Sequence, residues 1–259
     1  MKNSEKFWDK VSNLFNKPEK EMNNYQKTAR TFGLFFILTF LSYGIGSSLI
    51  ASILSVPDFL SNVYSNQAQI IVGVILMALV HTFSNIALAL LMLPILKPNY
   101  NFLAYGYLSF GIMATLILMV GTLFSLLLLP LSEAYAKADF IMTSNFELMG
   151  ILLKKAGFFS YHMGMALWSI GGLLFVSALY KSKLIPRGMS VWGIIGYIVL
   201  VSGSVLEIFE HRDIVEMVTV IPGGLFEITL SIWFIVKGFN TSAIASMSST
   251  ADRFSKIKQ

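Results

Sequence analysis

The length of its apolar runs is the feature that most constrains this chain. Uninterrupted apolar stretches of 18 to 27 residues recur between Phe32 and Val236. A helix needs about 20 residues to cross a hydrocarbon core of about 30 Å. Only 13% of the residues are charged and the mean hydropathy is +0.69, whereas a soluble domain is about 25% charged. These observations exclude a soluble globular enzyme and a disordered chain, and they predict an all-α polytopic membrane helix bundle.

Six apolar stretches are long enough to be transmembrane helices. They are Phe32–Val56, Ile70–Leu96, Leu103–Leu129, Gly157–Tyr180, Met189–Leu206 and Met217–Val236. Because proline breaks helices, Pro57 and Pro130 are predicted to end the first and third spans. The run from Pro222 to Gly224 is predicted to interrupt the sixth.

The stretch between the third and fourth spans is harder to assign. Asn145–Leu153 is apolar but too short to cross a bilayer. We therefore predict an interfacial or re-entrant segment near 141–155. A seventh span here would reverse the direction of every later helix.

The distribution of charge predicts the direction of the spans. With six spans, 15 of the 19 basic residues fall on the side of both termini, and eight of the 14 acidic residues fall on the other side. Cytoplasmic loops carry the excess of Lys and Arg, so both termini are expected in the cytoplasm. The net charge of +5 is then a topology signal, and the lipid bilayer, not nucleic acid, is the expected partner.

Residues 1–30 form a predicted cytoplasmic tail with its own pattern. Apolar residues fall on one helical face and lysines surround it: Phe7, Trp8, Val11, Leu14 and Phe15, with Lys6, Lys10 and Lys17. This pattern is typical of an amphipathic helix lying on anionic lipid head groups. The alternatives are a cytosolic helix that packs on the inner loops and a partly disordered tail. Residues 31–238 are the predicted transmembrane domain, and 239–259 a cytoplasmic C-terminal tail.

Small and polar residues follow one face of the first span. They recur every four residues: Thr39, Tyr43, Ser47, Ala51 and Ser55. Small residues let membrane helices approach closely, so this face is expected to point into the bundle. Ordinary helix packing is the preferred interpretation, and a substrate path lined by this row is the alternative.

Two ionisable residues lie deep within the predicted spans. Glu227 is about 15 Å from either boundary, and Ser231 follows it on the same helical face. His81 lies at a similar depth, with Asn85 one turn later. A charged group there is costly unless it is paired, hydrated or protonated. We predict a polar core at these four residues and hypothesise that His81 and Glu227 face each other, either as a structural pair or as a ligand or proton site.

No cofactor is predicted. The chain has no cysteine, which excludes thiolate ligands and nucleophiles. The histidines, His81, His162 and His211, lie in three separate segments, and the chain has no HExxH pattern. They are weak candidates for a metal site, and none is predicted.

The second half of the chain resembles a bacterial family called domain of unknown function 4386. The resemblance is carried by Tyr180–Gly196 (YKSKLIPRGMSVWGIIG) and by Glu227–Asn240 (EITLSIWFIVKGFN). It extends less specifically over Tyr25–Ser246. It implies a multi-span protein of the bacterial inner membrane and marks Glu227, Pro186 and Arg187 as motif positions. It implies no activity, because the family is uncharacterised.

The first of these motifs contains a basic inner loop. Lys181, Lys183 and Arg187 are expected to anchor the loop to lipid phosphates or to the C-terminal tail.

Three functions remain open from the sequence. The leading hypothesis is a non-enzymatic protein that binds or moves a small or lipidic ligand, or senses the state of the membrane, through its interior polar site. The first alternative is an intramembrane enzyme acting on lipid or peptide, with or without a metal ion held by its histidines. The second is a structural or regulatory subunit with a membrane-protein partner.

Overall fold

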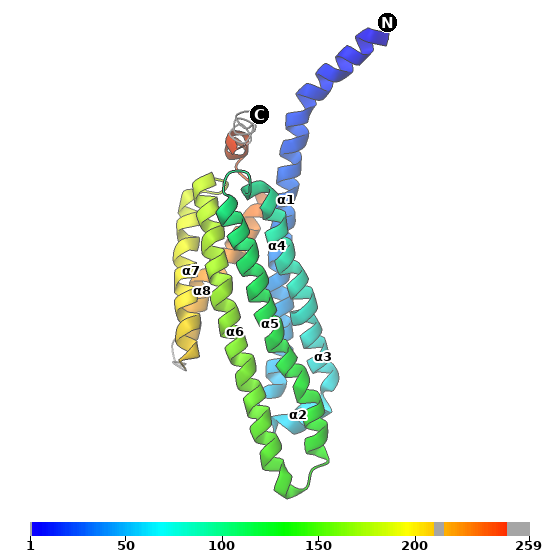
Figure 1. The fold of residues 1–259 in the computed structure, drawn as a ribbon, viewed down its shortest axis with the longest axis vertical. Helices are drawn as coiled ribbons and strands as arrows, with labels where there is room; N and C mark the ends of the chain where they lie inside the picture. Colours follow the sequence, from blue (N-terminus) through cyan, green and yellow to red (C-terminus); the bar gives the residue numbers. More distant parts are fainter. Residues whose placement is uncertain (1, 210–214, 248–259) are drawn as a thin grey trace.

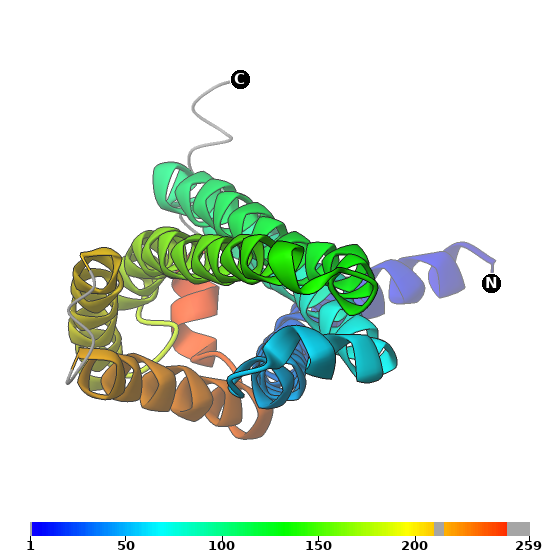
Figure 2. The same ribbon diagram turned by 90° about the horizontal axis from the view of Figure 1, so that it is seen from below.

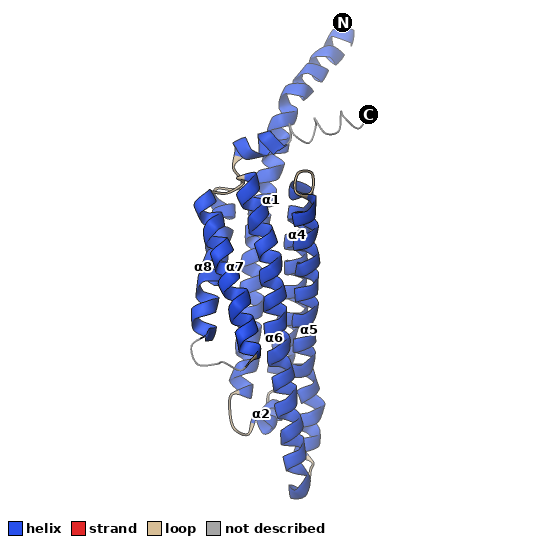
Figure 3. Ribbon diagram, turned by 60° about the vertical axis from the view of Figure 1, so that its left-hand side comes forward, coloured by secondary structure: helices blue, strands red, loops and turns tan. Residues whose placement is uncertain are grey.

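A computed structural model describes the backbone of residues 2–209 and 215–247 and the side chains of 22–139, 141–209 and 221–247. The described chain is helical and contains no strand (Figures 1 and 3). The helices are α1 (Lys2–Leu54), α2 (Phe59–Ser65), α3 (Gln67–Ile75), the π-helix η1 (Leu76–Val80), α4 (His81–Leu96), α5 (Asn101–Ala136), α6 (Phe140–Ser182), α7 (Arg187–Ile208) and α8 (Val215–Val236). A further short helix, Thr241–Met247, follows α8. The predicted all-α polytopic bundle is confirmed.

Five helical segments are long and apolar enough to cross a membrane: Met22–Leu54, Gln67–Leu96, Asn101–Ala136, Ile141–Ser182 and Arg187–Ile208. A sixth crossing is obtained if Ile221–Val236, within α8, is taken together with Thr241–Met247, from which it is bent by 86°. The second predicted span is composite, because α3, η1 and α4 follow one another without a loop.

Two predicted helix breaks are wrong. Pro57 does follow the end of α1, but Pro130 lies inside α5, which continues to Ala136. Pro222 likewise lies inside a continuous α8. Proline removes one backbone donor, and neighbouring helices in a bundle can compensate for that loss. A proline alone therefore did not locate the breaks.

The expectation near 141–155 is wrong as to a re-entrant segment, whereas an interfacial position stays a prediction. These residues form the first part of α6, which runs unbroken for 43 residues. At 1.5 Å per residue, α6 is about 65 Å long, roughly twice the thickness of the hydrocarbon core. The hairpin of α5 and α6 therefore reaches well beyond the ends of α7 and α8 (Figure 1).

The N-terminal tail continues the first span. Residues 2–21 are helical, as predicted, but they belong to the 53-residue α1 and extend it beyond the bundle (Figure 1). That their apolar face lies on lipid head groups stays a prediction.

The long helices form a closed ring. α1 packs on α4 and α8, α4 on α5, α5 on α6, α6 on α7, and α7 on α8. Seen along the bundle, α6 faces α1 and α8 across the interior, and α7 closes one end (Figure 2). Two separate apolar clusters fill the ring. The larger contains Phe32, Phe36 and Phe234, and the smaller, around Ile50 and Leu128, lies toward the α2 end.

The two sequence motifs that carry the family resemblance meet at the end of the bundle opposite α2. The backbone N–H of Asn240 donates to the Leu184 carbonyl at 2.9 Å. The side-chain amide of Gln26, on α1, donates to the carbonyl of Phe239 at 2.8 Å and accepts from its N–H at 3.1 Å. We call this joint the Gln26 clamp. It ties α1 and the chain after α8 to each other, and Asn240 adds the loop between α6 and α7.

Candidate functional site

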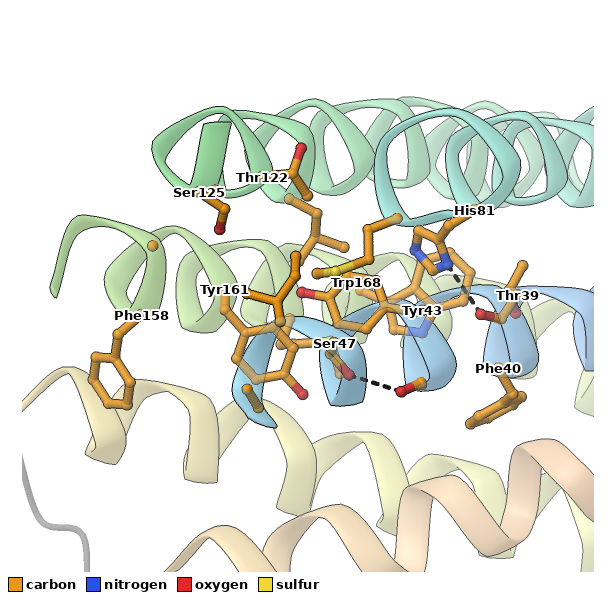
Figure 4. Close-up of a pocket in the computed structure, with 18 of the residues that line it drawn as sticks. Thr39, Phe40, Tyr43, Ser47, His81, Thr122, Ser125, Phe158, Tyr161 and Trp168 are labelled. Atoms are coloured by element: carbon orange, nitrogen blue, oxygen red, sulfur yellow. Dashed lines mark hydrogen bonds between the residues drawn. The ribbon is translucent and has the colours of Figure 1, made fainter. Parts of the chain in front are cut away.

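A cavity of about 750 Å³ lies inside the ring, partly open to the outside. It runs along α1, α5 and α6, and η1 and α4 add to its wall (Figure 4). It reaches from Lys154 on α6 to Trp168, fourteen residues later on the same helix, which is about 21 Å. Most of its wall is apolar, with polar groups concentrated at particular points, which is typical of small-molecule sites.

The small and polar face of α1 forms one side of this cavity. All five residues of the predicted row line it: Thr39, Tyr43, Ser47, Ala51 and Ser55. The expectation that this face points into the bundle is confirmed. It borders the cavity, and Tyr43 also packs against His81 on α4 and Tyr161 on α6.

Glu227 lies at the inner end of the cavity and is 6% exposed. Its Oε1 accepts hydrogen bonds from Trp168 Nε1 on α6 at 2.9 Å and from the hydroxyl of Tyr197 on α7 at 2.7 Å. The ring of Tyr197 has room because Gly172 lies against it, where a Cβ would overlap the ring. Three helices therefore fix the position of one carboxylate oxygen.

The second oxygen of Glu227 is available to the cavity. Oε2 accepts no hydrogen bond from any residue whose side chain the structure describes. It is also not among the enclosed polar atoms that lack a partner. Because Glu227 lines the cavity, Oε2 is the atom that this residue presents to it.

His81 lies on the opposite wall and is held at both ring nitrogens. Nδ1 is 3.2 Å from the carbonyl of Thr39, and Nε2 is 2.9 Å from Nδ2 of Asn85. Since a carbonyl only accepts, Nδ1 carries the proton and Nε2 accepts from the Asn85 amide, as in a neutral imidazole. The ring of Tyr43 lies 4.9 Å away. Oδ1 of Asn85 is buried without a partner.

The hypothesis that His81 and Glu227 form a direct hydrogen-bonded pair is wrong. Each residue has its own hydrogen-bond partners, and neither bonds to the other. They are nevertheless brought to the same cavity, together with Asn85. Ser231 does not line it, because its hydroxyl donates to the backbone carbonyl of Glu227 at 2.7 Å. The predicted polar core is thus three residues around a cavity, with Ser231 behind it.

Sequence reasoning missed both partners of Glu227. Trp168 and Tyr197 are two of many aromatic residues, 14% of the chain, so composition gave no reason to single them out. It also missed η1, although π-helical turns are frequent at functional sites. This turn directly precedes His81 and sets the face on which that residue lies.

Lys154 marks the other end of the cavity. Its ammonium group donates to the carbonyl of Leu54 at 2.7 Å and lies 4.4 Å from the centre of the Phe59 ring. Lys154 is the sole basic residue among the described residues of the cavity wall.

The predicted lipid anchors lie outside the cavity. Lys181, Lys183 and Arg187 are exposed at the end of the bundle opposite α2. The Arg187 guanidinium lies 5.4 Å from the centre of the Tyr180 ring. Their binding to lipid phosphates stays a prediction.

The histidines do not assemble a metal site within the described residues. No group of three His, Asp or Glu side chains converges there. His162 is buried against Phe158, with ring centroids 4.3 Å apart, and does not line the cavity. His211 lies outside the described residues.

Comparison with known families decides the assignment. The sequence profile described as "Domain of unknown function (DUF4386)" matches residues 31–238, most of the chain. The chain belongs to the DUF4386 family. Comparison with curated proteins gave no match, and neither did comparison with solved structures. In this DUF4386 protein, the motif residue Glu227 lies at the inner end of a cavity. The motif residues Phe239 and Asn240 have a structural role at the Gln26 clamp.

Proposed function

We propose that this DUF4386 protein binds an elongated, largely apolar small molecule or lipid in the interior cavity, with the polar end of the ligand at Glu227 and His81. One observation carries the proposal: a cavity of about 750 Å³ ends at a carboxylate oxygen that has no partner within the described protein. Pockets for drug-sized ligands have volumes of roughly 300–1,000 Å³.

The polar groups of the site also support binding. Oε2 of Glu227 faces the cavity and accepts no hydrogen bond from the described residues. A ligand that donates a hydrogen bond would satisfy this oxygen. Binding is the step that transport of a ligand and sensing of a ligand share.

The other two hypotheses have weaker support. A purely structural subunit is expected to have a closely packed interior, whereas this chain maintains a cavity. A metal-dependent enzyme would need converging ligands, which the described residues do not supply.

The test uses two adjacent serines on α1. Ser47 lines the cavity, whereas Ser48 is exposed and does not. We expect Ser47→Trp to fill the cavity and Ser48→Trp to leave it open. The measurement is native mass spectrometry of protein extracted directly into lipid nanodiscs.

The unsubstituted protein and Ser48→Trp should carry the same bound molecule, and its occupancy in Ser47→Trp should fall at least about tenfold, equivalent to 1.4 kcal/mol. Equal occupancy in both variants, or no bound molecule in any of the three proteins, would contradict the proposal.

A further inference from the structure

We propose that the polar end of the ligand is a cation, such as a protonated amine on a long apolar chain. This inference rests on the proposed function and specifies the class of ligand that the cavity accepts.

The first reason is the surroundings of Glu227. Its two hydrogen-bond donors, the indole of Trp168 and the hydroxyl of Tyr197, are both neutral. Both donate to Oε1, which leaves Oε2 as the oxygen that faces the cavity. No described Lys, Arg or His forms an ion pair with it. A buried carboxylate is costly unless it is paired, hydrated or protonated, and a cationic ligand at Oε2 would pair it.

The second reason is the distribution of charge along the cavity. Its positive group, Lys154, lies about 21 Å along α6 from Trp168, the residue that contacts Glu227. Lys154 is thus too far away to neutralise Glu227. A cationic ligand would be repelled from the Lys154 end and attracted to the Glu227 end. The two charges therefore orient an amine with its nitrogen inward.

The third reason is the aromatic wall between these two ends. Tyr43 and Tyr161 stack with their centroids 5.8 Å apart, and both line the cavity together with Trp168 (Figure 4). Aromatic faces attract cations, more strongly where water is excluded. A neutral alcohol would gain a hydrogen bond at Oε2 but would leave the charge of Glu227 uncompensated, and a carboxylate ligand would be repelled.

The experiment compares three probes with the same chain: dodecylamine, dodecanol and dodecanoate. Each is radiolabelled, and its saturable binding to the full chain is measured in nanodiscs of zwitterionic lipid. Glu227→Gln is the test variant. The matched control is Glu207→Gln, because Glu207 is equally buried, at 2% exposed, but does not line the cavity. Ser47→Trp identifies the binding that depends on the cavity.

We expect dodecylamine to bind at least about tenfold more tightly than either other probe, a difference of 1.4 kcal/mol. This preference should disappear in Glu227→Gln and persist in Glu207→Gln. If dodecanol binds as tightly as dodecylamine and this binding is lost in Ser47→Trp, the proposal of a cationic ligand is wrong. The cavity would still be a binding site. No saturable, Ser47-dependent binding of any probe would count against both proposals. The three probes are compared in the unsubstituted protein, so this part of the test does not depend on whether a variant folds.

Discussion

At the scale of single residues, the importance of Glu227 could be predicted from the sequence because charged residues are scarce in the apolar spans. A carboxylate near the middle of an apolar span must have a specific environment, and the structure places it at the end of a cavity. Its partners were not predictable, because a tryptophan or tyrosine in a membrane helix also packs as an ordinary large side chain. The contact between Trp168 and Glu227 joins positions 59 residues apart in the sequence.

Gly238 provides a prediction at this scale. It has a φ of +70°, and a Cβ there would overlap Oε1 of Gln26. We expect Gly238→Ala to lower the free energy of unfolding by about 1–3 kcal/mol, from left-handed strain and loss of the Gln26 clamp. The measurement is the unfolding transition of the purified protein in detergent.

Gly188→Ala is the control, because a Cβ at Gly188 meets nothing within 4 Å. Equal stability of the two variants would show that the Gln26 clamp contributes nothing.

At the scale of elements, the apolar runs located most of the helices but not their ends. The apolar runs end at charged residues such as Glu133 and Lys154, whereas the helices α5 and α6 continue through them. α6 therefore begins at Phe140, well before the predicted span at Gly157. Proline was an unreliable guide for the same reason, since Pro130 and Pro222 lie within continuous helices. The actual irregularity, η1, contains neither proline nor glycine.

η1 provides the prediction at this scale. A π-helical turn contains an extra residue that shifts the register of the helix after it. Deleting Ala78 should rotate His81 by about 100° relative to α3. Either α3 then loses its packing or His81 loses its hydrogen bond to Thr39. We expect a loss of about 2 kcal/mol or more, which lowers Tm by roughly 4–8 °C.

Thermal unfolding of the deletion variant in detergent measures this effect. An unchanged Tm, together with unchanged ligand occupancy, would mean that the register of α4 is not set by η1.

At the scale of the whole molecule, the charge pattern predicts an orientation that the fold makes testable. Lys137 lies between α5 and α6, at the α2 end of the bundle, and Lys181 lies at the opposite end. Both are exposed. If the termini are cytoplasmic, Lys137 faces outward and the Lys154 end of the cavity lies toward the outer side.

The absence of cysteine from the chain allows this orientation to be measured directly. We expect Lys137→Cys to react with a membrane-impermeant maleimide in intact spheroplasts. Lys181→Cys should react only after the membrane is permeabilised. The reverse pattern of labelling would invert the topology and place the Lys154 end of the cavity on the cytoplasmic side.

The central claim is that the cavity between α1, α5 and α6 holds a ligand against Glu227. The most direct measurement is a cryo-EM map of the full chain in native lipid nanodiscs, recorded for the unsubstituted protein and for Ser47→Trp. We expect elongated density along the wall that contains Tyr43 and Tyr161, ending within hydrogen-bonding distance of Glu227 Oε2, and we expect this density to be lost in Ser47→Trp. A cavity closed by packing of α1 on α6, with Glu227 satisfied by protein side chains alone, would contradict it.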